Sequence, residues 1–209
     1  MGRKAKIDRN MILEAAFELL DEGGIENVAI KSIAAKLDCS TQPVSWHFGS
    51  MMELKKELYF FAGAKMYGPL PGKMEGKDAF EAFFISGVHY ISIACDHPNV
   101  FRFLNVDNTE KTIGESITGN TSMFSHQFDR EAAKMIAGQF KVPEEDVNRA
   151  VRDVVIYSHG LAVMMIFDNF RMPKDQACRM MYDMGVKMLK DIGINTDNTI
   201  DLNNIANFY

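Results

Sequence analysis

The sequence predicts an all-α protein with a small amino-terminal domain and a larger carboxyl-terminal domain. Apolar residues recur at helical spacing in one segment after another. Glycine and proline residues separate these segments, as they do where helices end. Residues 33–48 read as two short helices joined by a tight turn. Because 47% of the 209 residues are apolar, the chain is able to bury a core.

Three helices are expected in the amino-terminal domain, residues 1–56. Their expected bounds are about 8–23, 30–37 and 41–48. Asp8 is predicted to cap the first helix, which Gly23 and Gly24 end. Pro43 falls in the first turn of the third helix, where its missing N–H does little harm.

The third helix has one face suited to packing and one suited to recognition. Val44 and Phe48 lie four residues apart and are expected to face inward, and Ser40 is expected to cap the helix. The residues left facing outward are Thr41, Gln42, Ser45 and Trp46. A short helix anchored in this way has the shape that enters a DNA major groove. Two helices around a turn also occur in all-α proteins without that function, so the flanking residues decide between the readings.

One set of residues spans the three helices and two turns at fixed intervals: Ile12, Ala15, Ala16, Leu19, Gly23 or Gly24, Ile33, Ala34, Ser40, Val44, His47, Phe48 and Leu54. With this set, residues from about 8 to 58 resemble the DNA-binding domain of the TetR family of transcriptional regulators. The resemblance implies a homodimer that binds a partly palindromic operator in double-stranded DNA. It also implies that a small-molecule effector relieves repression, although activation remains open.

The resemblance also implies which residues contact DNA. Thr41, Gln42 and Trp46 would meet base edges. The remaining residues of this surface, most of them expected at phosphates, are Lys31, Pro43, Ser45, His47, Lys55 and the basic arm Arg3, Lys4 and Lys6. The chain departs from the family at five positions, where Thr, Gly, Thr, Tyr and Lys are usual and this chain has Ala29, Asp38, Pro43, Ser45 and Met51. Because the usual tyrosine and lysine hold phosphates in the family, we expect a flatter salt dependence of binding, by about one unit of slope for each lost cation.

The second domain is expected over residues 57–192, after a fourth helix that begins in the first domain. The expected helices are about 51–67, 78–96, a short one after His97 and Pro98, the second half of 113–140, about 144–170 and about 174–192. Gly68 to Gly72 break the fourth helix, and residues 105–112 read as a polar loop. The tail, 193–209, is either a mobile terminus or, given its apolar residues, a segment that docks on the subunit or a partner.

The last two helices, about 144–170 and 174–192, predict a homodimer. The first of them becomes apolar on every side between Val154 and Phe167, and such a helix must be buried on every side. The core of the chain can cover one face, which leaves another for a second subunit. The two helices resemble the four-helix-bundle dimer interface of the TetR family.

No catalytic residue, metal site or cofactor is predicted. The five histidines have no metal-binding spacing, and neither a glycine-rich phosphate loop nor a GxSxG motif is present. The phenylalanines and methionines of the second domain are read first as core, but they also suit an adaptable ligand cavity. Polar residues that could orient a ligand there are His89, Tyr90, Arg102, His126 and Tyr157. For each of them alone, a role in the core or on the surface is the simpler explanation.

Charge and composition indicate where in the cell the protein is expected and which other functions are still to be considered. The net charge is −5, whereas the first nine residues are basic, so DNA binding is compatible with one end of the chain only. Without an apolar run of about twenty residues, a signal sequence or a CxxC pair, we expect a cytoplasmic protein with no membrane partner and with reduced thiols. Two alternatives are a helical small-molecule-binding protein with weakened DNA binding and an all-α enzyme. The missing acid–base groups disfavour the enzyme.

Overall fold

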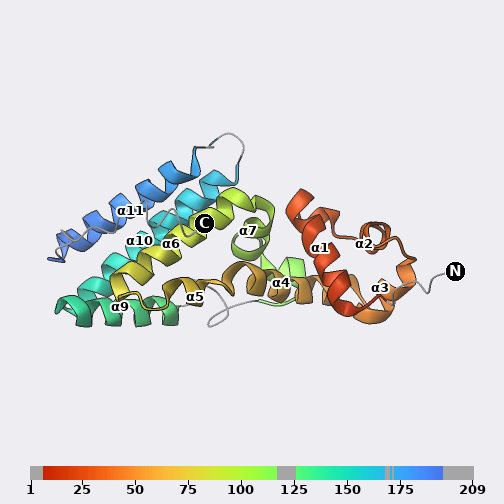
Figure 1. Cartoon of the computed structure of the whole chain (residues 1–209), viewed down its shortest axis with the longest axis horizontal. Helices are drawn as coiled ribbons and strands as arrows, with labels where there is room; N and C mark the ends of the chain where they lie inside the picture. The colour runs from red at the N-terminus through yellow and green to blue at the C-terminus, as the bar shows by residue number, and fades with distance from the viewer. Residues whose placement is uncertain (1–6, 117–125, 168–169, 171, 195–209) are drawn as a thin grey trace. The chain divides into compact units, whose positions relative to one another are not determined.

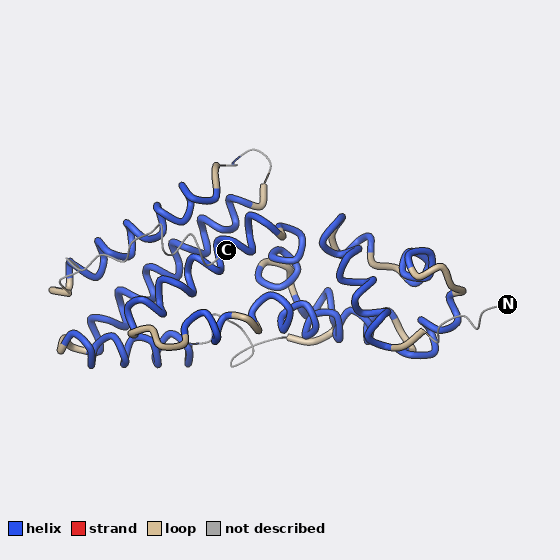
Figure 2. The backbone as a smooth tube through the Cα atoms, in the orientation of Figure 1, coloured by secondary structure: helices blue, strands red, loops and turns tan. Residues whose placement is uncertain are grey.

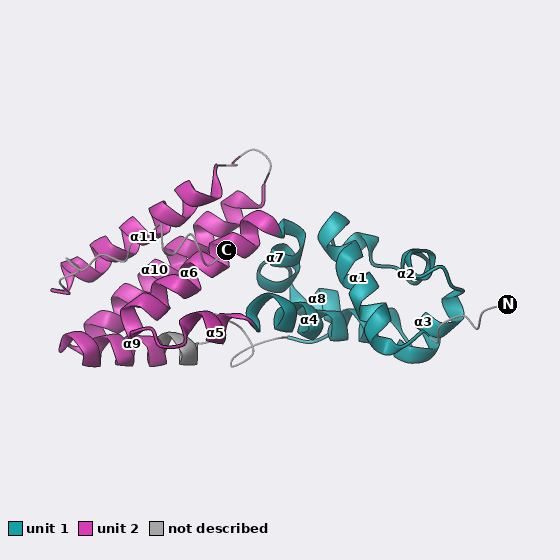
Figure 3. Ribbon diagram, in the orientation of Figure 1, with its two compact units in different colours: residues 1–68, 97–116 teal, residues 69–96, 117–209 magenta. Residues whose placement is uncertain are grey.

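The computed structural model describes residues 7–116, 126–167, 170 and 172–194. These residues form helices and no strand (Figure 2), which confirms the predicted all-α class. Within the described part, no helix combines the length and apolar character needed to span a membrane. The chain divides into two compact units (Figure 3). Unit 1 comprises residues 1–68 and 97–116, and unit 2 comprises residues 69–96 and 117–209.

Unit 1 begins with the helices that the sequence predicts. They are α1 (Arg9–Gly23), η1 (Ile25–Asn27), α2 (Ile30–Lys36), α3 (Thr41–Phe48) and α4 (Met51–Tyr67) (Figure 1). Asp8 caps α1 as expected, because its carboxylate accepts the Met11 N–H at 2.9 Å. Gly24 ends α1 with a φ of 81°, a conformation that glycine adopts without a steric penalty.

Unit 1 also contains two later helices, α7 (Pro98–Asn105) and α8 (Thr109–Ile113), which pack against α4. α7 contacts α1 as well, where the Asn99 side chain donates to the Asp21 carbonyl oxygen at 2.9 Å. The compact unit is therefore larger than the predicted domain of residues 1–56, whose boundary falls inside α4. The predicted loop over 105–112 is wrong from Thr109 onward, where α8 begins. Asn108 caps this helix by accepting the Lys111 N–H at 3.0 Å.

Unit 2 is a bundle of long helices around an aromatic core. Its helices are α5 (Leu70–Met74), α6 (Ala79–Asp96), α9 (His126–Phe140), α10 (Glu144–Met165) and α11 (Lys174–Asp191). α10 packs against α6, α9 and α11. At the centre, the fully buried ring of Phe84 lies with its centroid 4.8 Å from that of Phe80 and 4.7 Å from that of Tyr182. Aromatic side chains from two helices, α6 and α11, thus meet around one ring.

α10 departs from its prediction at its end, because it stops at Met165 rather than near 170. Within one chain it leaves an apolar face uncovered, as the prediction of a second subunit requires. Ile156 and Met164 on the helix, and Phe167 just after it, are 63%, 43% and 51% exposed. The predicted tail, 193–209, lies almost wholly outside the described residues.

Candidate nucleic-acid interface

The turn between α2 and α3 sets the angle between these two helices. Asp38 adopts the left-handed conformation, with a φ of 47°, and the Cys39 N–H donates to the Ala34 carbonyl oxygen at 3.0 Å. This pattern of a left-handed residue closed by a hydrogen bond ends many helices, usually with glycine. Aspartate tolerates it better than most residues, so the turn forms although glycine is absent. Ser40 occupies the N-cap position of α3 but its side chain forms no capping hydrogen bond, which corrects the prediction.

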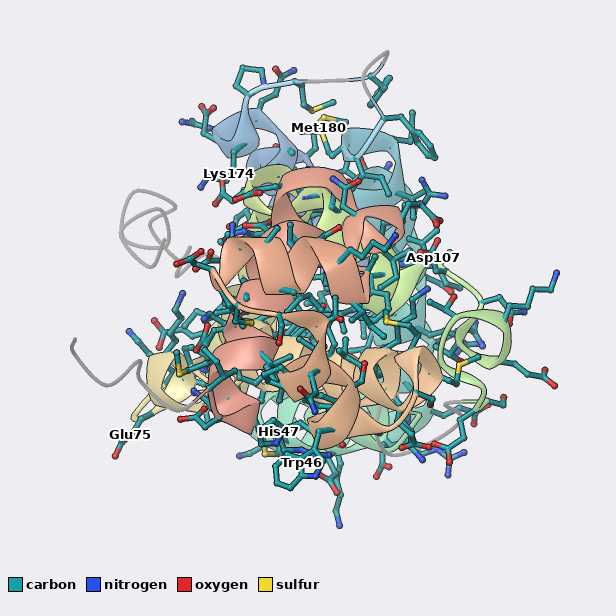
Figure 4. The ribbon with its side chains drawn as sticks, turned by 90° about the vertical axis from the view of Figure 1, so that its right-hand side faces the viewer. Trp46, His47, Glu75, Asp107, Lys174 and Met180 are labelled. Atoms are coloured by element: carbon teal, nitrogen blue, oxygen red, sulfur yellow. The ribbon has the colours of Figure 1, made fainter. Side chains whose placement is uncertain are left out.

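α3 presents the two faces that its sequence predicts. Val44 is fully buried and Phe48 is 5% exposed, so these two side chains anchor the helix. The outward residues Thr41, Gln42, Ser45 and Trp46 are all exposed. Trp46 is 76% exposed, the most of any large apolar side chain in the described residues. Figure 4 shows its indole projecting away from the ribbon next to His47.

Arg9 contacts the carboxyl-terminal end of α3 and holds it in place. Its guanidinium donates to the His47 carbonyl oxygen at 2.7 Å and also pairs with the Glu57 carboxylate of α4. It lies over the Phe48 ring, 4.5 Å from the ring centroid. The hydrogen bond to Glu57 raises the pKa of Arg9 above its ordinary value. In the sequence, Arg9 is one of four basic residues among the first nine, whereas the structure makes it a positioning residue.

His47 connects α3 to the segment that precedes α1. Its Nε2 donates to the Ile7 carbonyl oxygen at 3.2 Å. Its ring packs edge-on against that of Trp46, with centroids 4.8 Å apart. An open hollow of about 320 Å³ lies beside these rings, and its lining also includes Gln42, Pro43 and Ile7. The arm residues Arg3, Lys4 and Lys6 lie outside the described residues.

The remaining predicted cations differ in exposure. Lys31, near the start of α2, is exposed, and Lys55 on α4 is half-buried. Lys36 on α2 instead pairs with Glu22 at 2.9 Å and Glu18 at 3.0 Å, and these hydrogen bonds raise its pKa. Lys31 forms no such pair within the described part of the chain. It is therefore the better candidate for a phosphate contact.

The predicted ligand residues do not form one cluster. Arg102 lies in unit 1, on α7, and pairs with Asp107 at 3.1 Å. His89 and Tyr90 are neighbours on α6 but approach different helices of unit 2. His89 lies 3.4 Å from the Lys73 ammonium of α5, and the Tyr90 hydroxyl lies 2.8 Å from Nδ1 of His159 on α10.

The other two predicted ligand residues lie on helices of unit 2. Tyr157 is half-buried on α10, and His126 begins α9 with its side chain outside the described part. Sequence reasoning missed His159 as the partner of Tyr90. The two residues are 69 positions apart, and no local pattern marks such a pairing. Within the described residues, no group of histidine, cysteine, aspartate and glutamate side chains could hold a metal ion.

Burial of His159 makes the stability of the fold depend on pH. Desolvation lowers its pKa below the ordinary value of 6.5. The unfolded chain therefore binds more protons here than the folded chain, so the free energy of unfolding should fall as the pH drops below about 6.5. Replacing His159→Gln should reduce the loss of Tm between pH 7.5 and 5.5, measured by circular dichroism. An identical loss in both proteins would show that His159 does not set this dependence.

A family match covers the helices that build this surface. Residues 12–58 match the family described as bacterial regulatory proteins, tetR family. The uncharacterized HTH-type transcriptional regulator YobS of Bacillus subtilis (strain 168) is 18% identical over 175 residues, which are 84% of this chain and 87% of that protein.

Two solved structures share the fold of most of the chain. A TetR-like transcriptional regulator from Rhodococcus sp. RHA1 superposes with a TM-score of 0.65 at 17% identity, over 88% of this chain and 99% of that one. A TetR variant from Acinetobacter baumannii AYE in complex with minocycline has a TM-score of 0.56 at 18% identity, over 91% of this chain and 100% of that one. At these identities, the likeness concerns the fold.

Proposed function

This chain belongs to the tetR family of bacterial regulatory proteins, a family of transcriptional regulators rather than enzymes, and on that premise we propose a ligand-responsive repressor. As a homodimer in the cytoplasm it binds a palindromic operator, and a small apolar or amphipathic effector releases it. The observation that carries this proposal is the exposed outer face of α3, held in place by Val44, Phe48 and Arg9.

We assign the base contacts and the phosphate contacts to different residues of unit 1. Thr41, Gln42 and Trp46 read base edges from the outer face of α3. Phosphates are contacted by Lys31, Ser45, His47 and Lys55, and the arm Arg3, Lys4 and Lys6 adds positive charge. Pro43, which has no N–H to donate, belongs to the same DNA-binding surface without a hydrogen bond to phosphate. His47 and Pro43 border the hollow beside Trp46 and thus lie next to the base-reading residues.

The homodimer is proposed to form through α10 and α11. The exposed face of α10 is polar in its first half, with Arg149, Arg152 and Asp153, and apolar in its second half. Ile156, Gly160 and Met164 follow one another at intervals of four residues and thus lie on one face, with Phe167 after them. An apolar stripe of this kind on an otherwise packed helix supports burial against a second subunit.

The effector is proposed to bind among the helices of unit 2 and to act through α7. The predicted residues His89, Tyr90, His126 and Tyr157 lie in unit 2 and remain candidates for ligand contact, whereas Arg102 lies in unit 1. α7 follows α6 directly in the chain. At the start of α7, Nδ1 of His97 lies 2.9 Å from the Asp21 carboxylate of α1, and the Asn99 side chain donates to the Asp21 carbonyl oxygen at 2.9 Å. Because α7 packs against α1 and α4, a displacement of α6 that moves α7 would also displace α1 and α4. Coupling of this kind is typically about 1–3 kcal/mol.

Selection of binding sites from random duplexes, at low and at near-physiological salt, tests the proposal. We expect enrichment of a palindrome whose half-sites are one helical turn or a small multiple of it apart. Retention of DNA without enrichment of any sequence would contradict the proposed regulator. The alternative, a helical ligand-binding protein with a weakened DNA-binding surface, predicts no salt-dependent retention of any duplex.

Replacing Lys31→Ala should flatten the salt dependence of operator binding. Each phosphate contact contributes about 0.9 to the slope of log K against log salt concentration, so the slope should fall by about that amount per subunit. Fluorescence anisotropy at several salt concentrations measures it. Lys36→Ala on the same helix is the matched control and should leave the slope unchanged, because Lys36 is already paired with Glu18 and Glu22. Equal slopes for the wild type and Lys31→Ala would remove Lys31 from the interface.

A further inference from the structure

The recognition surface of α3 carries no charged side chain suited to reading guanine or cytosine. From Ser40 to Ser50 the sequence contains no lysine, arginine, aspartate or glutamate. Guanine is read most often by arginine or lysine at its O6 and N7, and cytosine by an acidic side chain at its N4 amino group. Arg9 contacts α3 from α1, but its guanidinium is engaged with Glu57 and the His47 carbonyl oxygen. α3 is therefore poorly equipped to read G·C pairs directly.

The side chains that are present match the two bases of an A·T pair. Gln42 is exposed, and its amide carries both a donor and an acceptor, the combination that pairs with N6 and N7 of adenine. Trp46 offers a large apolar face and one N–H donor. In the major groove, the C5-methyl group of thymine is the apolar group on a base edge, and the O4 acceptor lies beside it.

The side chains of Gln42 and Trp46 are exposed and able to contact base edges. Within the described part of the chain, neither the Gln42 amide nor the Trp46 indole N–H takes part in a hydrogen bond. Both border the open hollow of about 320 Å³, together with the apolar side chains of Ile7 and Pro43. Gln42 and Trp46 are four residues apart, which is about 6 Å along a helix and close to the rise of two base pairs.

We propose that α3 reads an A·T-rich half-site, in which Gln42 pairs with an adenine and Trp46 packs on the 5-methyl group of a thymine about two base pairs away. This proposal rests on the proposed operator binding and adds the bases that are recognised. The neutral surface gives affinity through shape and the methyl contact, while the lysines of α2 and α4 supply attraction to the backbone.

The first test is the composition of the selected half-site. We expect A·T pairs at the major-groove positions that Gln42→Ala and Trp46→Ala cease to discriminate. A selected palindrome with G·C at those positions would overturn this proposal and leave operator binding intact. Failure to select any sequence would overturn both.

The second test removes the methyl group from the DNA and leaves the protein unchanged. Replacing thymine by uracil at the Trp46 position keeps the base pair but removes one buried methyl group. It should weaken wild-type binding about fourfold, the factor that corresponds to about 0.8 kcal/mol per buried carbon. The same replacement should not affect Trp46→Ala, which is expected to fold normally because Trp46 is 76% exposed. Uracil at a thymine outside the contacted positions is the control.

The third test addresses Gln42 in the same way. Replacing adenine by 7-deazaadenine removes the N7 acceptor, and this should weaken wild-type binding at least fivefold, in keeping with the strength of a bidentate base contact. Gln42→Ala should be insensitive to it. Equal sensitivity of the wild type and the variants to both modified bases would refute the assigned contacts.

Discussion

Replacing Ile156→Asp on α10 is expected to turn the proposed homodimer into a monomer at micromolar concentration. Ile156 is 63% exposed in the single chain and lies in the apolar stripe with Met164 and Phe167. Burial of such a side chain is worth about 1.5–3 kcal/mol, and a two-fold symmetric interface loses it twice. The dimer dissociation constant should therefore rise by two orders of magnitude or more. Sedimentation at several protein concentrations measures it.

Met135→Asp on α9 is the matched control for this experiment. Met135 is also a large apolar side chain of unit 2 and is 56% exposed, but it lies outside the stripe. This variant should keep the dimer and its operator affinity, whereas Ile156→Asp should lose affinity for the full palindrome and not for a single half-site. The reverse result, dissociation by Met135→Asp alone, would assign the interface to α9.

Replacing Gly185→Leu is expected to produce the largest loss of stability. A Cβ added to Gly185 of α11 would lie 2.6 Å from Cε1 of the Phe84 ring and 3.4 Å from Val154. Phe84 is fully buried and cannot move without displacing its neighbours. Overpacking of this kind typically costs about 1–3 kcal/mol, and leucine adds three further carbon atoms. We expect a decrease of about 3 kcal/mol in the free energy of unfolding, measured by urea denaturation.

Gly138→Ala on α9 is the control for glycine replacement as such. Within the described part of the chain, no atom outside the backbone of α9 itself lies within 4 Å of a Cβ at this position. Alanine should therefore leave the free energy of unfolding unchanged or raise it by up to about 1 kcal/mol. If Gly185→Leu were as stable as Gly138→Ala, α6, α10 and α11 would not be in the close contact described above.

The helices of the recognition unit were predictable because their signals are local. Asp8 before an apolar-periodic segment, Gly24 after it and Val44 four residues before Phe48 are readable without knowledge of any distant contact. The bounds of α3 and α4 agree with their predictions for this reason. The exposure of Trp46 also follows from helical periodicity alone, once Val44 and Phe48 are taken to face the core.

The candidate site was predictable only in part, because the residues that hold α3 in place come from distant parts of the chain. Arg9 is 38 residues from the His47 carbonyl oxygen that it contacts, and 48 residues from Glu57. In the sequence, Arg9 is one more basic residue close to Arg3, Lys4 and Lys6, and no local pattern distinguishes it from them. Tyr90 and His159 likewise reveal no relation until α6 and α10 are packed together.

The sequence by itself determined the all-α class, the bounds of the first helices and the neutral chemistry of the outer face of α3, since periodicity, caps and residue type are properties of short segments. Only the tertiary structure decided that Arg9 holds α3 in place, that α7 and α8 belong to unit 1, and which residues of α10 form the exposed apolar stripe. These facts depend on which distant surfaces meet. Many pairings of amphipathic helices satisfy the same local pattern, and the packing of whole side chains selects one of them.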